Sequence, residues 1–293
     1  MIIELARRVL PLPIKNAIRA AQSSRNGFVR RMVRKGERER LEIAMQYLNK
    51  SVNLAKAWAK LDKETSNFYY ALADLNKDQL TQLICVVTDK NYDEIAGYLN
   101  EIETDAALKN HIENTLKTSG YGEDIKVEFA RRIGWYAFVR ILKPKVVIET
   151  GVDHGVGACV ITSALRRNAA EGFTGRYFGT DFNPSAGRLL TGPYAEFGEI
   201  VYGDSIETLS RFQQPIDLFI NDSDHSAEYE YREYQTIKDK LTIGAVILGD
   251  NAHVTDKLSL FSRESGRSFL FFAEKPRDHW YPGAGLGISY PHR

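Results

Sequence analysis

Short apolar runs alternate with helical stretches along the second half of the chain, from about residue 123 onward. The runs typical of buried strands are 146–148, 177–180, 200–202, 216–220, 245–248, 269–272 and 286–290. Between them, helices are expected near 157–167, 206–211, 227–240 and 254–264. Strand–helix alternation of this kind predicts right-handed crossover connections and a parallel sheet.

The end of the chain departs from this alternation. No helical stretch separates the last two apolar runs, and Pro276, Pro282 and Gly283 lie between them instead. Because Pro and Gly favour turns over helices, the last strand is expected to return antiparallel. The pattern predicts an α/β fold, with a Rossmann-like, doubly wound, mostly parallel seven-stranded sheet whose last strand is antiparallel.

The first half of the chain has the apolar spacing of helices, from residue 40 to about 118, and no strand-like alternation. The segment 118–122 contains paired glycines flanked by Ser and Thr, which break helices. An α-helical N-terminal domain is therefore expected ahead of the α/β domain. The expected segments are a basic amphipathic arm over 1–40, a helical domain over 41–120 and the α/β domain over 121–293.

Charge is distributed unevenly along the chain. The formal net charge is only +1, so the whole chain is not an electrostatic partner for nucleic acid. Residues 1–40, however, hold eleven Lys and Arg against three acids, a net charge of +8. Basic residues interleaved with apolar ones suit an anionic membrane surface, but they also suit a solvated or partner-packed arm. Both readings stay open.

Cysteine content and hydropathy bear on the compartment. Cys85 and Cys159 are the only cysteines, which is no disulfide framework and favours a reducing compartment. No run approaches the roughly 20 apolar residues of a membrane span. The expectation is a cytoplasmic protein, either free or peripheral on the inner face of the membrane.

Acidic residues follow or end five of the expected strands: Glu149, Asp181, Asp204, Asp222 and Asp250. In open α/β sheets, ligands bind outside the carboxyl ends of the strands. Clustered anions repel one another, so stability alone is a poor explanation for this placement. A cation or a hydroxyl-bearing ligand would relieve the repulsion.

A glycine-bearing turn follows the first strand. Its spacing, Gly151-x-x-x-Gly155-x-Gly157, does not fit the G-x-G-x-x-G pattern of nicotinamide-binding sites. Glu149 before the turn suits a cationic amino-acid ligand better than a pyrophosphate. Asp181, after the next strand, is placed to bind ribose hydroxyls. These features count against a nicotinamide oxidoreductase.

The stretch Lys143–Gly155 resembles the first motif of class I S-adenosylmethionine-dependent methyltransferases, and the resemblance extends over about 135–290. Asp153 departs from it, since many members have glycine there. The cofactor-binding residues expected on this resemblance are Glu149, Gly151 and Gly155 at the methionine end, Asp153 in the same loop, Asp181 at the ribose, and Asp204 and Ser205 near the adenine.

A second resemblance concerns the later strand ends. The segments 216–225 and 244–251 are similar to those of catechol and caffeoyl-coenzyme A O-methyltransferases, which bind a divalent metal. The matching residues are Asp222, Asp250 and Asn251. Three oxygen ligands suit a hard cation such as Mg²⁺, and a metal-bound hydroxyl loses its proton more easily.

His225 stands three residues after Asp222, where the catechol enzymes carry a lysine. Histidine titrates near neutrality and can act as a general base. The Asp-x-x-His form also resembles bacterial sugar and secondary-metabolite methyltransferases with a helical N-terminal extension. The catalytic candidates are therefore His225 and Asp222.

The expected function is O-methylation of a hydroxyl on a small molecule or sugar, with S-adenosylmethionine as cofactor. A divalent metal is expected to assist, and Mg²⁺ is the first candidate. One alternative is a metal-independent methyltransferase in which His225 is the base. Another is a non-catalytic protein that docks to a membrane or partner and retains a vestigial cofactor fold. A homo-oligomer is compatible with the sequence.

Overall fold

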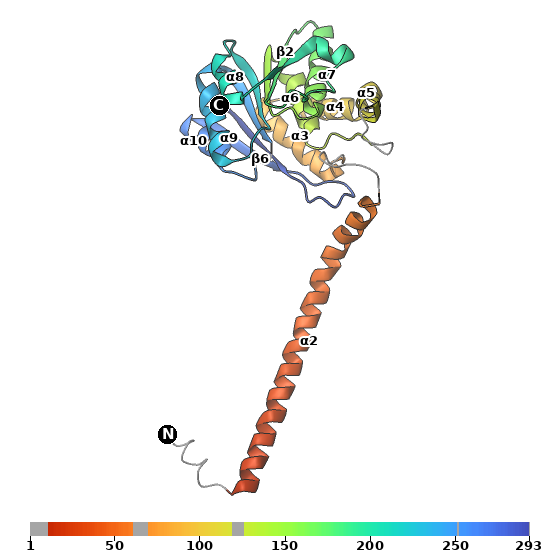
Figure 1. Ribbon diagram of the computed structural model, residues 1–293, viewed down its shortest axis with the longest axis vertical. Helices are drawn as coiled ribbons and strands as arrows, with labels where there is room; N and C mark the ends of the chain where they lie inside the picture. The colour runs from red at the N-terminus through yellow and green to blue at the C-terminus, as the bar shows by residue number, and fades with distance from the viewer. Residues whose placement is uncertain (1–10, 61–69, 119–125, 251, 293) are drawn as a thin grey trace. The chain divides into compact units, whose positions relative to one another are not determined.

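The computed structural model describes residues 11–60, 70–118, 126–250 and 252–292 (Figure 1). By its backbone contacts, the chain divides into two compact units, Met1–Ala57 and Trp58–Arg293. The domain boundary expected between residues 40 and 41 falls within a single helix, and the one expected between 120 and 121 lies outside the described residues. The three expected segments remain predictions.

Helix α2 (Leu12–Trp58) runs unbroken for 47 residues. Pro13 lies in its first turn, where a missing N–H removes no helical hydrogen bond. The ion pair of Lys35 with Glu39 is mostly exposed, so it contributes little to stability. Within the part of the chain that the structure describes, no helix is both long and apolar enough to cross a membrane.

The second unit is built on one seven-stranded sheet with the order β3-β2-β1-β4-β5-β7-β6. Strands β1 to β5 pair in parallel, and β7 runs antiparallel to both β5 and β6. The fold class and the antiparallel last strand predicted from the sequence are confirmed. The strands are β1 (Val146–Thr150), β2 (Arg176–Asp181), β3 (Gly198–Tyr202), β4 (Ile216–Asn221), β5 (Leu241–Asp250), β6 (Arg267–Ala273) and β7 (Gly285–Pro291).

Helices cover both faces of the sheet (Figure 1). One face carries α3 (Asp74–Thr88), α4 (Tyr92–Glu103), α5 (Ala106–Thr118), α6 (Arg132–Leu142) and α7 (Val156–Ala170). The other carries α8 (Ser205–Arg211), α9 (Ala227–Ile237) and α10 (Lys257–Glu264). Because α3 to α5 share one hydrophobic core with the sheet, the helical region is packed into the same unit as the strands.

The start of α6 is fixed by segments that are distant in sequence. Ala130 N donates to Tyr70 O at 3.1 Å, and Ala73 N donates to Lys275 O at 2.9 Å. Ala130 itself has a φ of 50°, in the left-handed region that non-glycine residues adopt at a cost. These contacts bring the first residues of α6 to the carboxyl end of β5 and to the loop that joins β6 and β7.

Candidate active site

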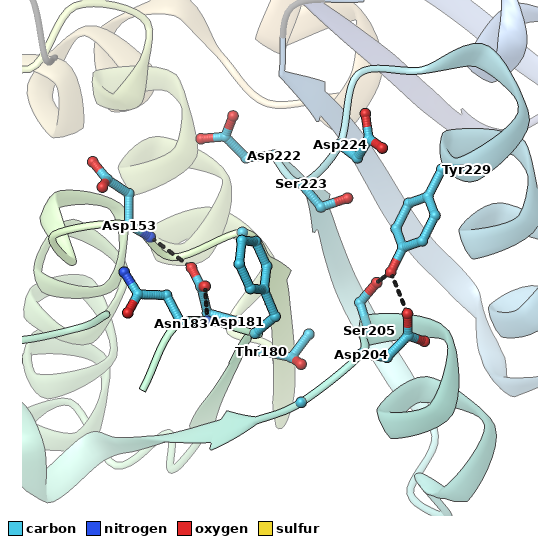
Figure 2. Close-up of a pocket in the computed structure, with 13 residues that line it drawn as sticks. Asp153, Thr180, Asp181, Asn183, Asp204, Ser205, Asp222, Ser223, Asp224 and Tyr229 are labelled. Carbon is cyan, nitrogen blue, oxygen red and sulfur yellow. Dashed lines mark hydrogen bonds between the residues drawn. The ribbon is translucent and has the colours of Figure 1, made fainter. Parts of the chain in front are cut away.

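A cavity of about 630 Å³ opens at the carboxyl ends of β1, β2 and β4, where the sequence analysis places a ligand (Figure 2). Its volume lies within the range usual for small-molecule and cofactor sites. The residues that line it are Gly151, Asp153, Thr180, Asp181, Phe182, Asn183, Gly203, Asp204, Ser205, Asp222, Ser223, Asp224 and Tyr229. Of the expected cofactor residues, Gly151, Asp153, Asp181, Asp204 and Ser205 are on this wall, whereas Glu149 and Gly155 are not.

Gly151 lets two strand ends approach each other closely. It has a φ of 79°, and a Cβ added there would lie 2.0 Å from the backbone oxygen of Asp222. Asp222 N in turn donates to Thr150 O at 2.8 Å. Because Gly151 has no side chain, Asp222 can lie against the end of β1. Asp153 retains the left-handed conformation that glycine favours, with a φ of 47°.

Asp181 ties the turn after β1 to the end of β2. Its Oδ2 accepts hydrogen bonds from Val152 N at 2.9 Å and Asp153 N at 3.0 Å, and its Oδ1 accepts one from Asn183 N at 2.8 Å. Figure 2 shows Asp153, Asp181 and Asn183 together at the cavity. A carboxylate oxygen has two lone pairs, and Oδ1 uses only one of them here. Asp181 can therefore hold the turn and still accept a hydroxyl from a ligand in the cavity.

Sequence reasoning missed two neighbours of Asp181. Phe182 lines the cavity and is 86% exposed, so it offers an uncovered aromatic face to a flat ligand. Thr180 also lines it, and its buried Oγ1 has no hydrogen-bond partner within the described part of the chain. A buried hydroxyl is costly when it lacks a partner, and a polar ligand in the cavity is a natural one. The sequence feature that could have pointed to Phe182 is an aromatic residue directly after the strand-end acid Asp181.

Glu233 on α9 supports the cavity wall from beneath. Its carboxylate accepts hydrogen bonds from Ser205 Oγ, Thr150 Oγ1, Asn221 Nδ2 and Ser223 Oγ. Burial raises the pKa of Glu233 to about 7, although these hydrogen bonds act in the opposite direction. Glu233 thereby fixes residues from β1, β4 and α8. The sequence feature that could have pointed to Glu233 is a glutamate on the buried face of a predicted helix.

Tyr229 completes this part of the wall. Its hydroxyl lies 2.8 Å from Ser205 Oγ and donates to Asp204 Oδ2 at 3.0 Å (Figure 2). Asp204 also caps α8, since its Oδ1 accepts from Glu207 N at 3.0 Å. Asp204 and Ser205 are therefore held in place before any ligand binds.

Glu149 lies beneath the cavity, not on its wall. It is 1% exposed, and its carboxyl group accepts a hydrogen bond from the Tyr177 hydroxyl. Burial raises the pKa of Glu149 to about 8. A Cβ at Gly157 would lie 2.1 Å from Glu149 Oε1 and 2.8 Å from Trp135 Cζ3. The start of α7 therefore packs directly on this carboxyl group.

Asp222 and Asp250 are brought together, as expected of residues from adjacent strands. Their carboxyl groups share a hydrogen bond. Burial, and then the charge of Asp250, raises the pKa of Asp222 well above its usual range. Burial would also raise the pKa of Asp250, but the charge and hydrogen bonds of Arg131 outweigh burial and lower it. The pKa values of the two carboxyl groups are therefore shifted in opposite directions, upward for Asp222 and downward for Asp250.

This arrangement does not fit the expected divalent metal. Both carboxylate oxygens of Asp250 accept hydrogen bonds from the Arg131 guanidinium, through Nε and Nη2. Asn251, the third expected ligand, lies outside the described residues. Among the residues described, no group of three or more His, Cys, Asp or Glu side chains is arranged to hold a metal ion.

His225 lies beside the cavity. Its Nε2 is 3.8 Å from Asp222 Oδ1, and its side chain is 34% exposed. Asp222 lines the cavity, so the imidazole stands next to its wall at the start of α9. The structure thus brings the two catalytic candidates, His225 and Asp222, together.

Comparison with known proteins finds a matching family model within the α/β segment. Residues 148–252 match a family model described as a methyltransferase domain. No curated protein matches the chain. The chain is similar to the structure of an O-methyltransferase from Bacillus cereus in complex with SAH, with 12% identity, 73% of this chain and 97% of that one covered, and a TM-score of 0.49.

Two further structures are similar at comparable levels. TomG from Streptomyces achromogenes, an O-methyltransferase involved in tomaymycin synthesis, was solved in complex with SAM; it shares 18% identity over 64% of this chain and 91% of that one, with a TM-score of 0.47. A methyltransferase from Geobacter sulfurreducens shares 18% identity over 69% of this chain and 96% of that one, also with a TM-score of 0.47.

The family match takes in the glycine turn and every strand-end acid that the sequence analysis singled out, from Glu149 to Asp250. These residues sit on a seven-stranded sheet with parallel β1 to β5 and an antiparallel β7. The matched segment thus lies on the mostly parallel α/β sheet that the sequence predicts, and its description as a methyltransferase domain agrees with the family that the sequence resembles.

Proposed function

We propose that this enzyme methylates a hydroxyl group of a small molecule or sugar, with His225 as the base and without a divalent metal. The observation that supports the proposal is the distance of 3.8 Å between His225 Nε2 and Oδ1 of Asp222, a residue that lines the cavity. A hydroxyl bound there would have a proton acceptor beside it. The Asp250 carboxylate, held by Arg131, is not offered to a metal.

The cavity suits S-adenosylmethionine as the methyl donor. Asp181 would accept hydrogen bonds from the ribose hydroxyls, and Phe182 would pack against the adenine ring. Asp153, Asp222 and Asp224 put carboxyl groups around the same space, which favours a ligand with positive groups. When bound, the cofactor supplies a methyl group activated by a positively charged sulfur.

The chain's own residues supply the proton transfer. His225 would take the hydroxyl proton as the acceptor oxygen forms its bond to the methyl carbon and the carbon–sulfur bond breaks. The proton then leaves to solvent through the exposed part of the imidazole. Asp222 is a positioning residue in this scheme, because it keeps the imidazole at the wall. Binding donor and acceptor side by side supplies the remaining advantage.

Calorimetric titration of the full chain with S-adenosylmethionine and with its demethylated product tests the cofactor assignment. Binding of one equivalent is expected, and its absence at high micromolar cofactor would contradict the proposal. Product release can then be followed across a panel of phenolic and sugar hydroxyl acceptors.

Histidine variants test the base. Replacement His225→Gln is expected to lower kcat by about 100-fold or more, the contribution usual for a general base. The matched control is His292→Gln, since His292 is an exposed residue beyond β7 whose ring bonds Ser268. Equal kcat in wild type and His225→Gln would show that another group removes the proton.

A further inference from the structure

Two consecutive arginines stand where α6 begins. Arg131 is the N-cap and Arg132 is the first helical residue. A positive charge is unfavourable at this end of a helix, because the helix dipole is positive there. Both side chains are also largely buried, with 9% and 17% exposure. Such a placement requires strong compensation, which must come from other elements.

Arg131 finds that compensation in two buried acids. Its Nε and Nη2 bind the two oxygens of Asp250, and its Nη1 donates to Glu274 Oε2 at 3.0 Å. Glu274 is itself fixed, because it also accepts from Arg131 N at 2.9 Å, Tyr70 OH at 3.1 Å and Ala284 N at 3.0 Å. The guanidinium therefore spans the ends of β5 and β6 in a closed network.

Arg132 stands beside the other acid of the expected metal site. Its Nη2 lies 3.8 Å from Asp222 Oδ2, and its guanidinium carbon lies 5.3 Å from the centre of the Trp135 ring. Arg131 thus pairs with Asp250, and its neighbour Arg132 faces Asp222.

We propose that Arg131 and Arg132 exclude a divalent cation from the expected metal site at Asp222 and Asp250, and that their guanidinium groups supply the positive charge there instead. This inference rests on the proposed function. A cation at Asp250 would have to displace a guanidinium that binds both carboxylate oxygens, which would leave the arginine buried beside a second positive charge. Breaking a buried pair in this way weakens cation binding by about 100-fold or more relative to free carboxylates.

The charge arrangement has a consequence for the acceptor. A metal favours acceptors with two adjacent hydroxyls, because both oxygens can bind the ion. With fixed guanidinium groups in its place, nothing at Asp250 demands a second hydroxyl. The enzyme is expected to accept compounds with a single reactive hydroxyl as readily as their adjacent dihydroxy analogues.

Metal binding to the full chain tests the inference directly, by the loss of the free Mn²⁺ signal in electron paramagnetic resonance. The wild type is expected to leave the signal unchanged up to millimolar Mn²⁺. Arg131→Gln is expected to gain Mn²⁺ affinity by at least about 10-fold, since Asp250 is then released. Adding Asp250→Asn to that variant is expected to abolish the gain.

Several results would overturn the inference. One is binding of one Mn²⁺ per wild-type chain at micromolar concentration. Another is a folded Arg131→Gln protein, checked by circular dichroism, with no gain in affinity. If Arg131→Gln does not fold, Arg132→Gln is read in the same way, because its partner Asp222 belongs to the same site. Wild-type cofactor binding, measured by calorimetry, separates the two proposals: cofactor binding together with Mn²⁺ binding leaves S-adenosylmethionine-dependent methylation standing, and it removes this inference together with the metal-free part of the proposed function.

Discussion

The buried carboxyl group of Glu149 makes the stability of the second unit depend on pH in a way that one substitution should remove. Burial raises the pKa of Glu149 to about 8 in the folded protein, against 4.5 for an ordinary glutamate. Between these two values the folded chain holds a proton that the unfolded chain releases. Stability therefore falls as pH rises through this window, and the favourable contribution is lost above about 8.

The size of the effect follows from the same interval. About 3.5 pH units at about 1.4 kcal/mol each give an upper limit of ~5 kcal/mol between pH 4.5 and 8. Over the practical range from about pH 5.5 to 8, the expected loss is ~3 kcal/mol. In Glu149→Gln the group is always neutral and can still accept the Tyr177 hydrogen bond, so this part of the slope should vanish.

The assay is urea unfolding of wild type and Glu149→Gln across this pH range, without cofactor. The pKa of Glu233 is also raised, but both proteins contain this residue. Its contribution therefore cancels in the difference between the two free energies of unfolding, which reports the effect of Glu149. Relative to that of the wild type, the free energy of unfolding of Glu149→Gln should increase steadily as pH rises. Parallel pH profiles for the two proteins would refute the reasoning, because they would mean that Glu149 titrates alike in the folded and unfolded states.

Three further predictions concern the turn, the cofactor and the first helix. Gly157→Ala should destabilise the protein by about 1–3 kcal/mol in urea unfolding, since its Cβ meets Glu149 and Trp135; an unchanged midpoint contradicts the close packing. Asp181→Asn should weaken S-adenosylmethionine binding in calorimetry by about 10- to 100-fold, as expected for a hydrogen bond to a charged group; unchanged affinity would remove Asp181 from the site. A membrane contact of residues 1–40, one of the two alternatives left open by their charge, predicts sedimentation with anionic vesicles but not neutral ones, and reduced sedimentation of the triple variant Arg31→Glu, Arg34→Glu and Arg38→Glu, at about 1 kcal/mol per lost cation; equal sedimentation with both vesicle types contradicts it.

The sequence predicts where the strand-end acids lie along the sheet, but not which way each one points. Parallel strands place their carboxyl ends on one edge, so Asp181, Asp204 and Asp222 could be assigned to one site before the structure was known. Successive side chains of a strand alternate between the two faces. Glu149 belongs to β1 itself, one residue before its end, and it lies under α7 instead of in the cavity.

The partners of Asp250 could not be predicted from local sequence. Arg131 precedes Asp250 by 119 residues and Glu274 by 143, and only the packing of α6 against the sheet brings the three together. No spacing rule connects residues so far apart. The one local sign was the charge itself, since two arginines ahead of the apolar stretch Ile133–Val139 place positive charge at the unfavourable end of a helix.

The repulsion among strand-end acids, which led to the expectation of a cation or a hydroxyl-bearing ligand, is relieved here in two different ways. Where an acid is buried away from the cavity, the protein supplies the remedy: Glu149 keeps a proton, and Asp250 takes the Arg131 guanidinium. Where acids face the cavity, as Asp153 and Asp181 do, the protein leaves room for a ligand. A count of acids in the sequence therefore overstates the need for a metal, because part of the negative charge is neutralised within the fold. The need that remains is at the cavity wall, where a positively charged sulfur and a ribose can meet it.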